Sequence, residues 1–307
     1  MTGTLFAVPA LTLLFGFLIA AIVWVALDRK EPHTRDLELR FPKLADMRAD
    51  TVRIRMISFG IGLVAAGACA FLGDNGLGLL LAPTVLALVM IVGLRVQEFK
   101  HSKAASDHRV ASLTGRRAVD YLRPVTGATL AFTVVAFAWV VIAGEIFGDD
   151  AGAGRARNLS LQCADYASST GPFPGSFYTR PMLVGAVILA GVGAWAVIAI
   201  VRRPRDARPD VVDIDDSLRV EATQGVMSAI VVGIGLQVAG ASFFATGAFA
   251  RIAGSQQMCP IPTSYSVAHW LYACALVVAI VVVVIAGKRY FIPTAANHYL
   301  TKAGMMR

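Results

Sequence analysis

The sequence predicts an all-α, polytopic integral membrane protein of about seven transmembrane helices, and three observations support this fold class. Apolar residues make up 56% of the 307 residues and charged residues only 16%, against about 25% charged residues in a typical soluble domain. The charged residues are crowded into short stretches that separate long uncharged ones. All but four of the 28 Lys and Arg residues fall on one side of the membrane that these stretches predict.

Seven stretches are long and apolar enough to cross a bilayer, which takes about 20 residues. The second and third are separated only by residues 73–76 (GDNG). Asp, Asn and Gly accept the left-handed backbone of a tight turn, so these two stretches predict a helical hairpin. The first is too long for a signal-peptide core and lacks an obvious cleavage site, which predicts an uncleaved helix. The seven stretches are residues 6–27, 56–72, 78–94, 125–147, 182–201, 223–244 and 266–287.

The distribution of Lys and Arg predicts an N-terminus outside and a C-terminus in the cytoplasm, because cytoplasmic loops of membrane proteins are enriched in these residues. In that orientation the cytoplasmic segments are residues 28–55, 95–124, 202–222 and 288–307. The basic residues left on the outer side are Arg155, Arg157, Arg180 and Arg251. We therefore expect a multi-pass protein of the plasma membrane. Its net charge of +8 reflects topology and contact with the lipid bilayer, and we expect no nucleic-acid partner.

An internal repeat relates the second and sixth stretches. Residues 60–71 (GIGLVAAGACAF) reappear as residues 233–244 (GIGLQVAGASFF), with eight of twelve positions identical. Chance similarity between Gly- and Ala-rich helices is the alternative to duplication. Proline landmarks favour duplication, since the first and fifth stretches are bracketed at the same spacing by Pro9 and Pro32 and by Pro181 and Pro204.

The repeat, if real, matches predicted helices 1–3 with helices 5–7. Four spans separate the copies, so both copies have the same orientation and form a parallel repeat. The predicted organisation is a first three-helix unit at residues 1–124, a linking helix 4 with a long outer loop at residues 125–181, and a second unit with the cytoplasmic tail at residues 182–307. Such pseudo-symmetry tends to place a cavity or a partner groove between the halves.

Three polar residues in or near the predicted spans are candidates for lining a ligand cavity: Gln237, Glu145 and His269. Gln237 is the most deeply placed, and its structural alternative is an interhelical hydrogen bond. Glu145 and His269 lie near outer helix ends, where water at the membrane interface can hydrate a polar side chain. No Asp, Glu, Lys or Arg falls near the middle of any span, which disfavours an ion-driven pump. His269 also belongs to a predicted aromatic belt at the outer interface, with Tyr265, Trp270 and Tyr272.

The repeated glycines predict faces for close helix packing, since small residues let helix backbones approach in a membrane. A flexible gate is the alternative. These residues are Gly60, Gly62, Gly67, Gly233, Gly235 and Gly240.

The four cysteines divide by location. Cys69 and Cys274 lie within spans and are expected to be buried small apolar residues. Cys163 and Cys259 fall in outer loops, on the oxidising side, which predicts a disulfide between them. That bond would join the loop after predicted helix 4 to the loop after helix 6. Two free thiols are the alternative.

The longest outer segment, residues 148–181, mixes turn formers with aromatic residues. It could be a ligand lid, a docking surface for a partner or a simple cap over the bundle. The sequence has no phosphate-binding loop, zinc-protease motif, nucleophile elbow or CxxC pair. We therefore name no catalytic residue, metal site or cofactor.

Three function classes are compatible with these patterns. The first is a transport component, either a small-solute permease or a membrane subunit working with a separate ATPase; the repeat supports it. The second is a non-catalytic scaffold or accessory subunit that binds other membrane proteins through its glycine faces and outer loop. The third is a membrane enzyme that acts on a lipid-linked substrate, which would need convergent acid, base or metal ligands. We rank them in that order, so an enzyme is the least favoured of the three classes.

The predicted disulfide gives the first test. Alkylation of the unfolded chain without reductant should label Cys69 and Cys274 and leave Cys163 and Cys259 joined. Mass spectrometry of the peptides measures this outcome, and labelling of both loop cysteines would contradict the prediction.

Overall fold

The computed structural model describes six helices that are long and apolar enough to cross a membrane, and almost all of the described chain is helical. The described residues are 42–72, 74–104, 109–110, 121–150, 154–162, 167–203, 205–206, 209–254 and 260–292. The predicted first span, residues 6–27, lies outside them. The structure therefore bears on six of the seven predicted spans, and a multi-spanning helical protein is what it supports.

The helices are longer than the apolar stretches that predict them. Residues 223–244, for example, form only the middle of a helix that begins at Pro209 and ends at Gly254. Hydropathy marks the part of a helix that suits hydrocarbon, whereas backbone hydrogen bonds continue the helix through polar turns on either side. The six helices are α3 (Pro42–Ala70), α4 (Leu77–Ala104), α5 (Pro124–Phe147), α6 (Ser176–Val201), α7 (Pro209–Gly254) and α8 (Thr263–Phe291).

The predicted hairpin is present as α3 and α4, joined through the short 3-10 helix η1 (Asp74–Gly76). Asn75 and Gly76 adopt φ values of 56° and 80°, the left-handed backbone that Asn and Gly accept most readily. The hydroxyl of Tyr178, in α6, donates a hydrogen bond of 2.6 Å to the carbonyl of Asn75. This bond ties the hairpin turn to the rest of the bundle.

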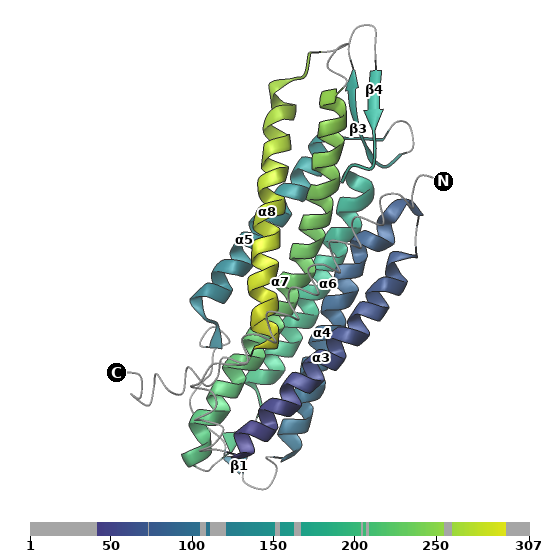
Figure 1. Ribbon diagram of the computed structural model, residues 1–307. Helices are drawn as coiled ribbons and strands as arrows, with labels where there is room; N and C mark the ends of the chain where they lie inside the picture. Colours follow the sequence, from purple (N-terminus) through teal and green to yellow (C-terminus); the bar gives the residue numbers. More distant parts are fainter. Residues whose placement is uncertain are drawn as a thin grey trace.

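Helix α7 is the centre of the bundle. It packs against α4, α5, α6 and α8, and its most extensive contact is with α8; Figure 1 shows α3 and α4 on one side of it and α5 on the other. In the most apolar segment of α7, 78% of the residues are buried, against 22% in the corresponding segment of α3. Outer helices expose large apolar side chains, such as Val64 at 75% and Trp270 at 68%. Lipid tails would cover such surfaces in a membrane.

The long outer loop folds as a three-stranded antiparallel sheet, which the sequence did not predict. Its strands are β2 (Gly148–Asp149), β3 (Asn158–Gln162) and β4 (Ala167–Thr170), in the order β2-β3-β4. Alternate residues of β3, Leu159 and Leu161, are buried in the main core. Tyr265 of α8 donates a hydrogen bond of 2.6 Å to the carbonyl of Ser160. Of the three roles considered for this loop, a cap over one end of the bundle fits these contacts.

The two ends of the bundle differ in what they carry. The sheet end carries β2, β3 and β4, at the top of Figure 1. The basic end carries Arg55, Arg203 and Arg219, and near it two further short strands, β1 (Arg109–Val110) and β5 (Arg205–Asp206), pair antiparallel. The helices alternate in direction between these ends, so α3 and α7 begin at the basic end and α4, α6 and α8 finish there.

Two expectations about side chains were wrong. Cys274 is exposed and Cys69 is only half-buried, because α3 and α8 each turn one face away from the bundle, where a thiol is apolar enough to meet lipid. Tyr272 is fully buried and packs against Trp139 and Phe249, so it belongs to the core. Trp270, two residues earlier in α8, is exposed as an interfacial aromatic residue should be.

The contact between α7 and α8 predicts the outcome of a glycine substitution. A Cβ atom at Gly235 would lie 2.5 Å from Cγ2 of Val283, and a β-branched valine in a helix has almost no other rotamer to adopt. Gly235→Ala should destabilise the protein by about 1–3 kcal/mol through overpacking, seen as a lower unfolding temperature in detergent. Gly67→Ala is the matched control, because no described atom lies within 4 Å of its new Cβ. Equal unfolding temperatures for the two variants would contradict this packing.

Candidate functional site

The basic end contains buried charges that hold several helices together. Arg55 projects from α3 with a fully buried side chain, and its Nη2 lies 3.0 Å from Oε1 of Glu221 in α7. Its Nη1 donates a hydrogen bond of 2.7 Å to the carbonyl of Tyr290 in α8. The guanidinium also lies over the Tyr290 ring, 5.7 Å from its centroid. One arginine therefore joins α3, α7 and α8.

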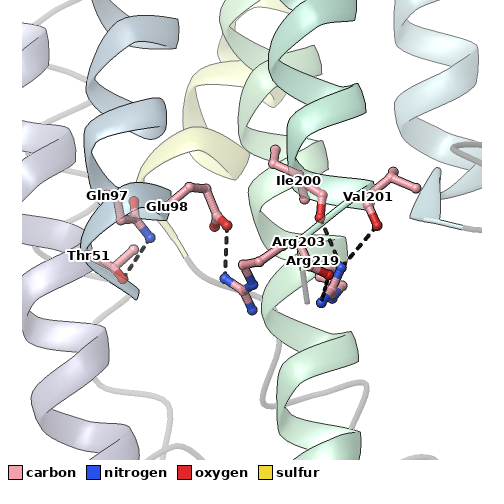
Figure 2. A network of polar contacts seen from close by, with 7 residues as sticks. All are labelled: Thr51, Gln97, Glu98, Ile200, Val201, Arg203 and Arg219. Carbon is pink, nitrogen blue, oxygen red and sulfur yellow. Dashed lines mark hydrogen bonds and ion pairs between the residues drawn. The ribbon is translucent and has the colours of Figure 1, made fainter. Parts of the chain in front are cut away.

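A second buried ion pair lies nearby (Figure 2). Nη1 of Arg203, just after α6, lies 2.8 Å from Oε2 of Glu98 in α4. The preceding residue, Gln97, donates from Nε2 to Oγ1 of Thr51 in α3 at 2.9 Å. These side chains connect the end of α6 to the α3–α4 hairpin.

Arg219 caps the end of α6. Its Nη1 donates to the carbonyls of Ile200 and Val201 at 2.9 and 3.2 Å, and its Nη2 donates to the carbonyl of Arg203 at 2.8 Å (Figure 2). The last four carbonyls of a helix have no partner within the helix. Arg219 is fully buried, so it supplies those carbonyls with donors where water cannot.

Sequence reasoning missed this cluster, because it counted the same residues as topology signals. Arg55, Glu98 and Arg203 fall in predicted cytoplasmic segments or at their edges, where basic residues need no further explanation. One signal was available: Arg219 and Glu221 stand directly before the apolar stretch of α7. A charged pair that enters an apolar helix must find partners or remain in water.

Gln237 lies in α7 with a fully buried side chain. Its Nε2 donates a hydrogen bond of 2.6 Å to Oγ1 of Thr84 in α4, and the backbone of Gly185 in α6 lies alongside both groups. Its Oε1 has no hydrogen-bond partner in the described part of the chain. The residue thus makes an interhelical hydrogen bond and keeps one acceptor available for a ligand or a water molecule.

Glu145 and His269 lie at the sheet end, on different helices. Glu145 of α5 is 42% exposed, accepts a hydrogen bond of 2.8 Å from Oγ1 of Thr179, and lies 3.8 Å from Nε of Arg180. His269 of α8 packs its ring against Phe249, and its Nδ1 has no partner among the described residues. No hydrogen bond, ion pair or ring contact joins Gln237, Glu145 and His269 to one another, so the three candidates do not form one cluster.

An aromatic cluster closes the sheet end around Phe249 of α7. Its ring contacts rings from α5, the outer loop and α8, at centroid distances from 5.6 to 6.3 Å. The partners are Phe147, Phe173, Tyr265, His269 and Tyr272. Rings at these separations pack edge to face or tilted, as their quadrupoles prefer. This cluster holds the cap on the bundle.

The six repeated glycines take different positions. Gly62 faces Leu86 of α4, Gly233 faces Ala87 of α4, and Gly235 faces Val283 of α8. Gly240 lies at ordinary contact distance from Leu80, whereas a Cβ at Gly60 or Gly67 would meet no described atom within 4 Å. The predicted disulfide partners, Cys163 and Cys259, lie outside the described residues.

Comparisons with protein-family models, with curated proteins and with solved structures each found no match. Among the described residues, no group of three or more His, Cys, Asp or Glu side chains could hold a metal ion. The function must therefore be argued from the buried polar groups themselves.

The hydrogen bonds from Arg219 to the end of α6 predict that substitution of Arg219 and of Arg202 will have different effects on stability. Arg219→Met keeps much of the side-chain volume but removes the side-chain donor from the carbonyls of Ile200, Val201 and Arg203, of which the Ile200 carbonyl keeps the backbone N–H of Arg203 at 3.3 Å. We expect it to destabilise the protein by about 2–3 kcal/mol, measured as a lower unfolding temperature in detergent. Arg202→Met is the control, because Arg202 is exposed. A similar unfolding temperature for both variants would show that Arg219 does not cap α6.

Proposed function

We propose that this chain is a transport component of the plasma membrane, either a small-solute permease or the membrane subunit of a transporter that works with a separate ATPase. The observation that carries this proposal is the pair of buried ion pairs at the basic end. We propose that this end faces the cytoplasm, as the distribution of Lys and Arg predicts, with the N-terminus outside.

The two ion pairs connect different halves of the chain. Arg55 and Glu98 belong to the first proposed unit, residues 1–124, whereas Glu221 and Arg203 belong to the second, residues 182–307. Each ion pair therefore joins one unit to the other. We refer to these four residues as the inter-unit clamp.

Burying the four charges of the clamp has a large desolvation cost. Removing two charges from water costs several kcal/mol per ion, and apolar residues of similar volume often stabilise a protein as well or better. Nε of Arg55 has no hydrogen-bond partner in the described chain, so this buried guanidinium is not fully compensated. Ionisable residues buried in membrane helices often mark functional pathways. A clamp of charges that can separate and become hydrated suits two units that move apart.

The helix packing supports two similar units. The most extensive contacts are α7 with α8 and α3 with α4, the two hairpins that the proposed repeat matches. Within the repeated motif, Gly62 of α3 and Gly235 of α7 occupy the same position, and each faces the helix that follows it. A parallel repeat places the solute path between or beside the units, near their shared axis.

A scaffold or accessory subunit is the second candidate, and the outer face of α3 favours it. Val64 is 75% exposed there, and Phe71, directly after the end of α3, is 85% exposed. Gly60 and Gly67 leave the backbone open. Small residues on an exposed helix face permit close packing by another membrane helix. The buried clamp does not follow from this function, so we place transport first.

Opening the clamp should open the proposed transporter. We expect liposomes containing the purified Glu98→Gln/Glu221→Gln double variant to take up at least one solute several-fold faster than liposomes with the wild-type protein. Glycerol and urea can be followed by stopped-flow light scattering, and alanine, glucose and rubidium ion by radiolabel. Because the variant removes the clamp itself, this increase is expected whether the solute or an ATPase normally releases it.

The control variant is Arg202→Gln, which removes a charge from the basic end without touching the clamp. It should leave every uptake rate unchanged. The proposal is wrong if no solute enters faster than into protein-free liposomes with either the wild-type protein or the double variant.

A further inference from the structure

One line of polar residues runs along α7. Gln224, Ser228 and Ser242 are separated by four and then fourteen residues, with Gly235 midway between the two serines, and this spacing places all four positions on one face of a helix. Gly235 lies against Val283 and the carbonyl of Ala279 in α8, so this face is directed toward α8. We call the contact between α5, α7 and α8 along this line the polar seam.

The polar atoms on this line are buried without partners. The exposed fractions are 4% for Gln224, 1% for Ser228 and 0% for Ser242. Nε2 of Gln224 and the hydroxyls of both serines have no hydrogen-bond partner among the described residues. Each buried polar group left without a partner destabilises the folded state by about 1–3 kcal/mol, so three such groups in one row would be costly if nothing else contacted them. Water molecules or a polar solute in the seam would supply partners.

Both facing helices add polar groups to the seam. Trp139 of α5 and Tyr272 of α8 are in ring contact, with centroids 5.9 Å apart. The indole Nε1 of Trp139 and the hydroxyl of the fully buried Tyr272 also lack a hydrogen-bond partner in the described chain. Toward the basic end, Arg289 of α8 donates to Oγ1 of Thr126 in α5 at 2.9 Å. Two further threonines, Thr129 and Thr133, continue along the buried face of α5.

An apolar cluster interrupts the seam at its middle. It forms a separate hydrophobic core and lies between Ser228 and Ser242, which are about 21 Å apart along α7 at the α-helical rise. Leu130 of α5 and Leu236 of α7 pack against it, and its members are Val231, Val232, Val282, Val283 and Ala286. A short apolar segment between two polar ones is the arrangement of a gate that closes by excluding water.

We propose that the polar seam is the path of a small uncharged polar solute, such as a polyol or an amide of the size of glycerol or urea. This inference rests on the proposed transport function and specifies its route and its substrate class. Arg55 of the inter-unit clamp holds Glu221 of α7 and the carbonyl of Tyr290 in α8. It thereby keeps the basic end of the seam shut.

The chemistry of the seam selects an uncharged solute. Its unpaired groups are hydroxyls, a side-chain amide nitrogen and an indole N–H, which are uncharged and form hydrogen bonds with a hydroxyl, an amide or water. A dehydrated ion would need several oxygen ligands or a counter-charge. Between Ser228 and Trp139 the seam offers no charged side chain among the residues named above.

Neighbouring pairs of residues on α7 give a matched test. Ser242→Cys places a thiol in the seam, whereas Ala241→Cys places one in the main core, and both positions are at most 1% exposed. Each is made in the Glu98→Gln/Glu221→Gln background, which opens the clamp, with the four native cysteines replaced by alanine. In liposomes, each is treated with methyl methanethiosulfonate, a small neutral reagent. We expect the thiol at 242 to react at least ten-fold faster, and its modification to slow glycerol and urea uptake.

A second pair avoids the cysteine replacements. In the Glu98→Gln/Glu221→Gln background, in which the clamp is open, Val231→Ser makes the apolar cluster polar and should raise glycerol and urea uptake a further several-fold without admitting rubidium ion. Ala229→Ser introduces the same hydroxyl into the main core and should leave uptake unchanged.

The outcomes separate the inference from the proposed function. Solute uptake that responds to the clamp variant but to neither seam variant would overturn the path and leave transport standing. Uptake of rubidium ion alone would overturn the substrate class. Absence of uptake by every variant, the clamp variant included, would remove the transport proposal and the path with it.

Discussion

The structure depends on one guanidinium held out of water at the meeting point of three helices. Arg55 needs acceptors, and it finds the carboxylate of Glu221 and the carbonyl of Tyr290. That carbonyl is available because α8 ends one residue later, at Phe291, and the last carbonyls of a helix have no partner inside it. Arg219 uses the carbonyls at the end of α6 in the same way. Arginines from one helix thus complete the ends of others, and this exchange fixes which helices meet at the basic end.

The requirement that buried polar groups find partners also explains why the polar seam is unusual. At the basic end the buried arginines Arg55 and Arg203 contact carboxylates, and Arg55 and Arg219 donate to carbonyls at helix ends, although Nε of Arg55 has no hydrogen-bond partner among the described residues. Along α7, by contrast, Gln224, Ser228 and Ser242 are equally buried and have no partner among the described residues. The bundle therefore contains a basic end where buried charges are held by ion pairs and helix carbonyls, and a face of α7 where the polar side chains named above have no partner in the described chain. The ion pairs and capped helix ends hold the helices together. The unpaired groups along α7 are where we propose that a polar solute is stabilised.

Much of the fold could be predicted from the sequence because the bilayer imposes simple rules. A continuous apolar stretch of about 20 residues crosses hydrocarbon as a helix, so the six described spans and the Asp-Asn-Gly turn followed from local residues. The buried clamp did not, because the sequence near Arg55 looks the same whether its side chain points to water or to α7. Pairing between residues more than one hundred positions apart, as for Glu98 and Arg203, depends on the packing of helices. Hydropathy and charge counts contain no information on that packing.

The proposed repeat is most informative where the two copies differ. If α3 corresponds to α7 and α4 to α8, the extensive contact of α4 with α7 should be matched by one of α3 with α8. The structure instead has a limited contact there, at the basic end, through Arg55 and the edge-to-face packing of Phe59 on Phe291. The reason lies in helix length. Helix α3 ends with its copy of the motif at Ala70, whereas α7 continues ten residues past its own copy to Gly254 and reaches the aromatic cluster under the cap. Helix α7 is anchored at both ends, and α3 is anchored to α8 at one. The movement that we propose for one unit against the other would therefore be controlled at this single contact, where Arg55 of the inter-unit clamp lies.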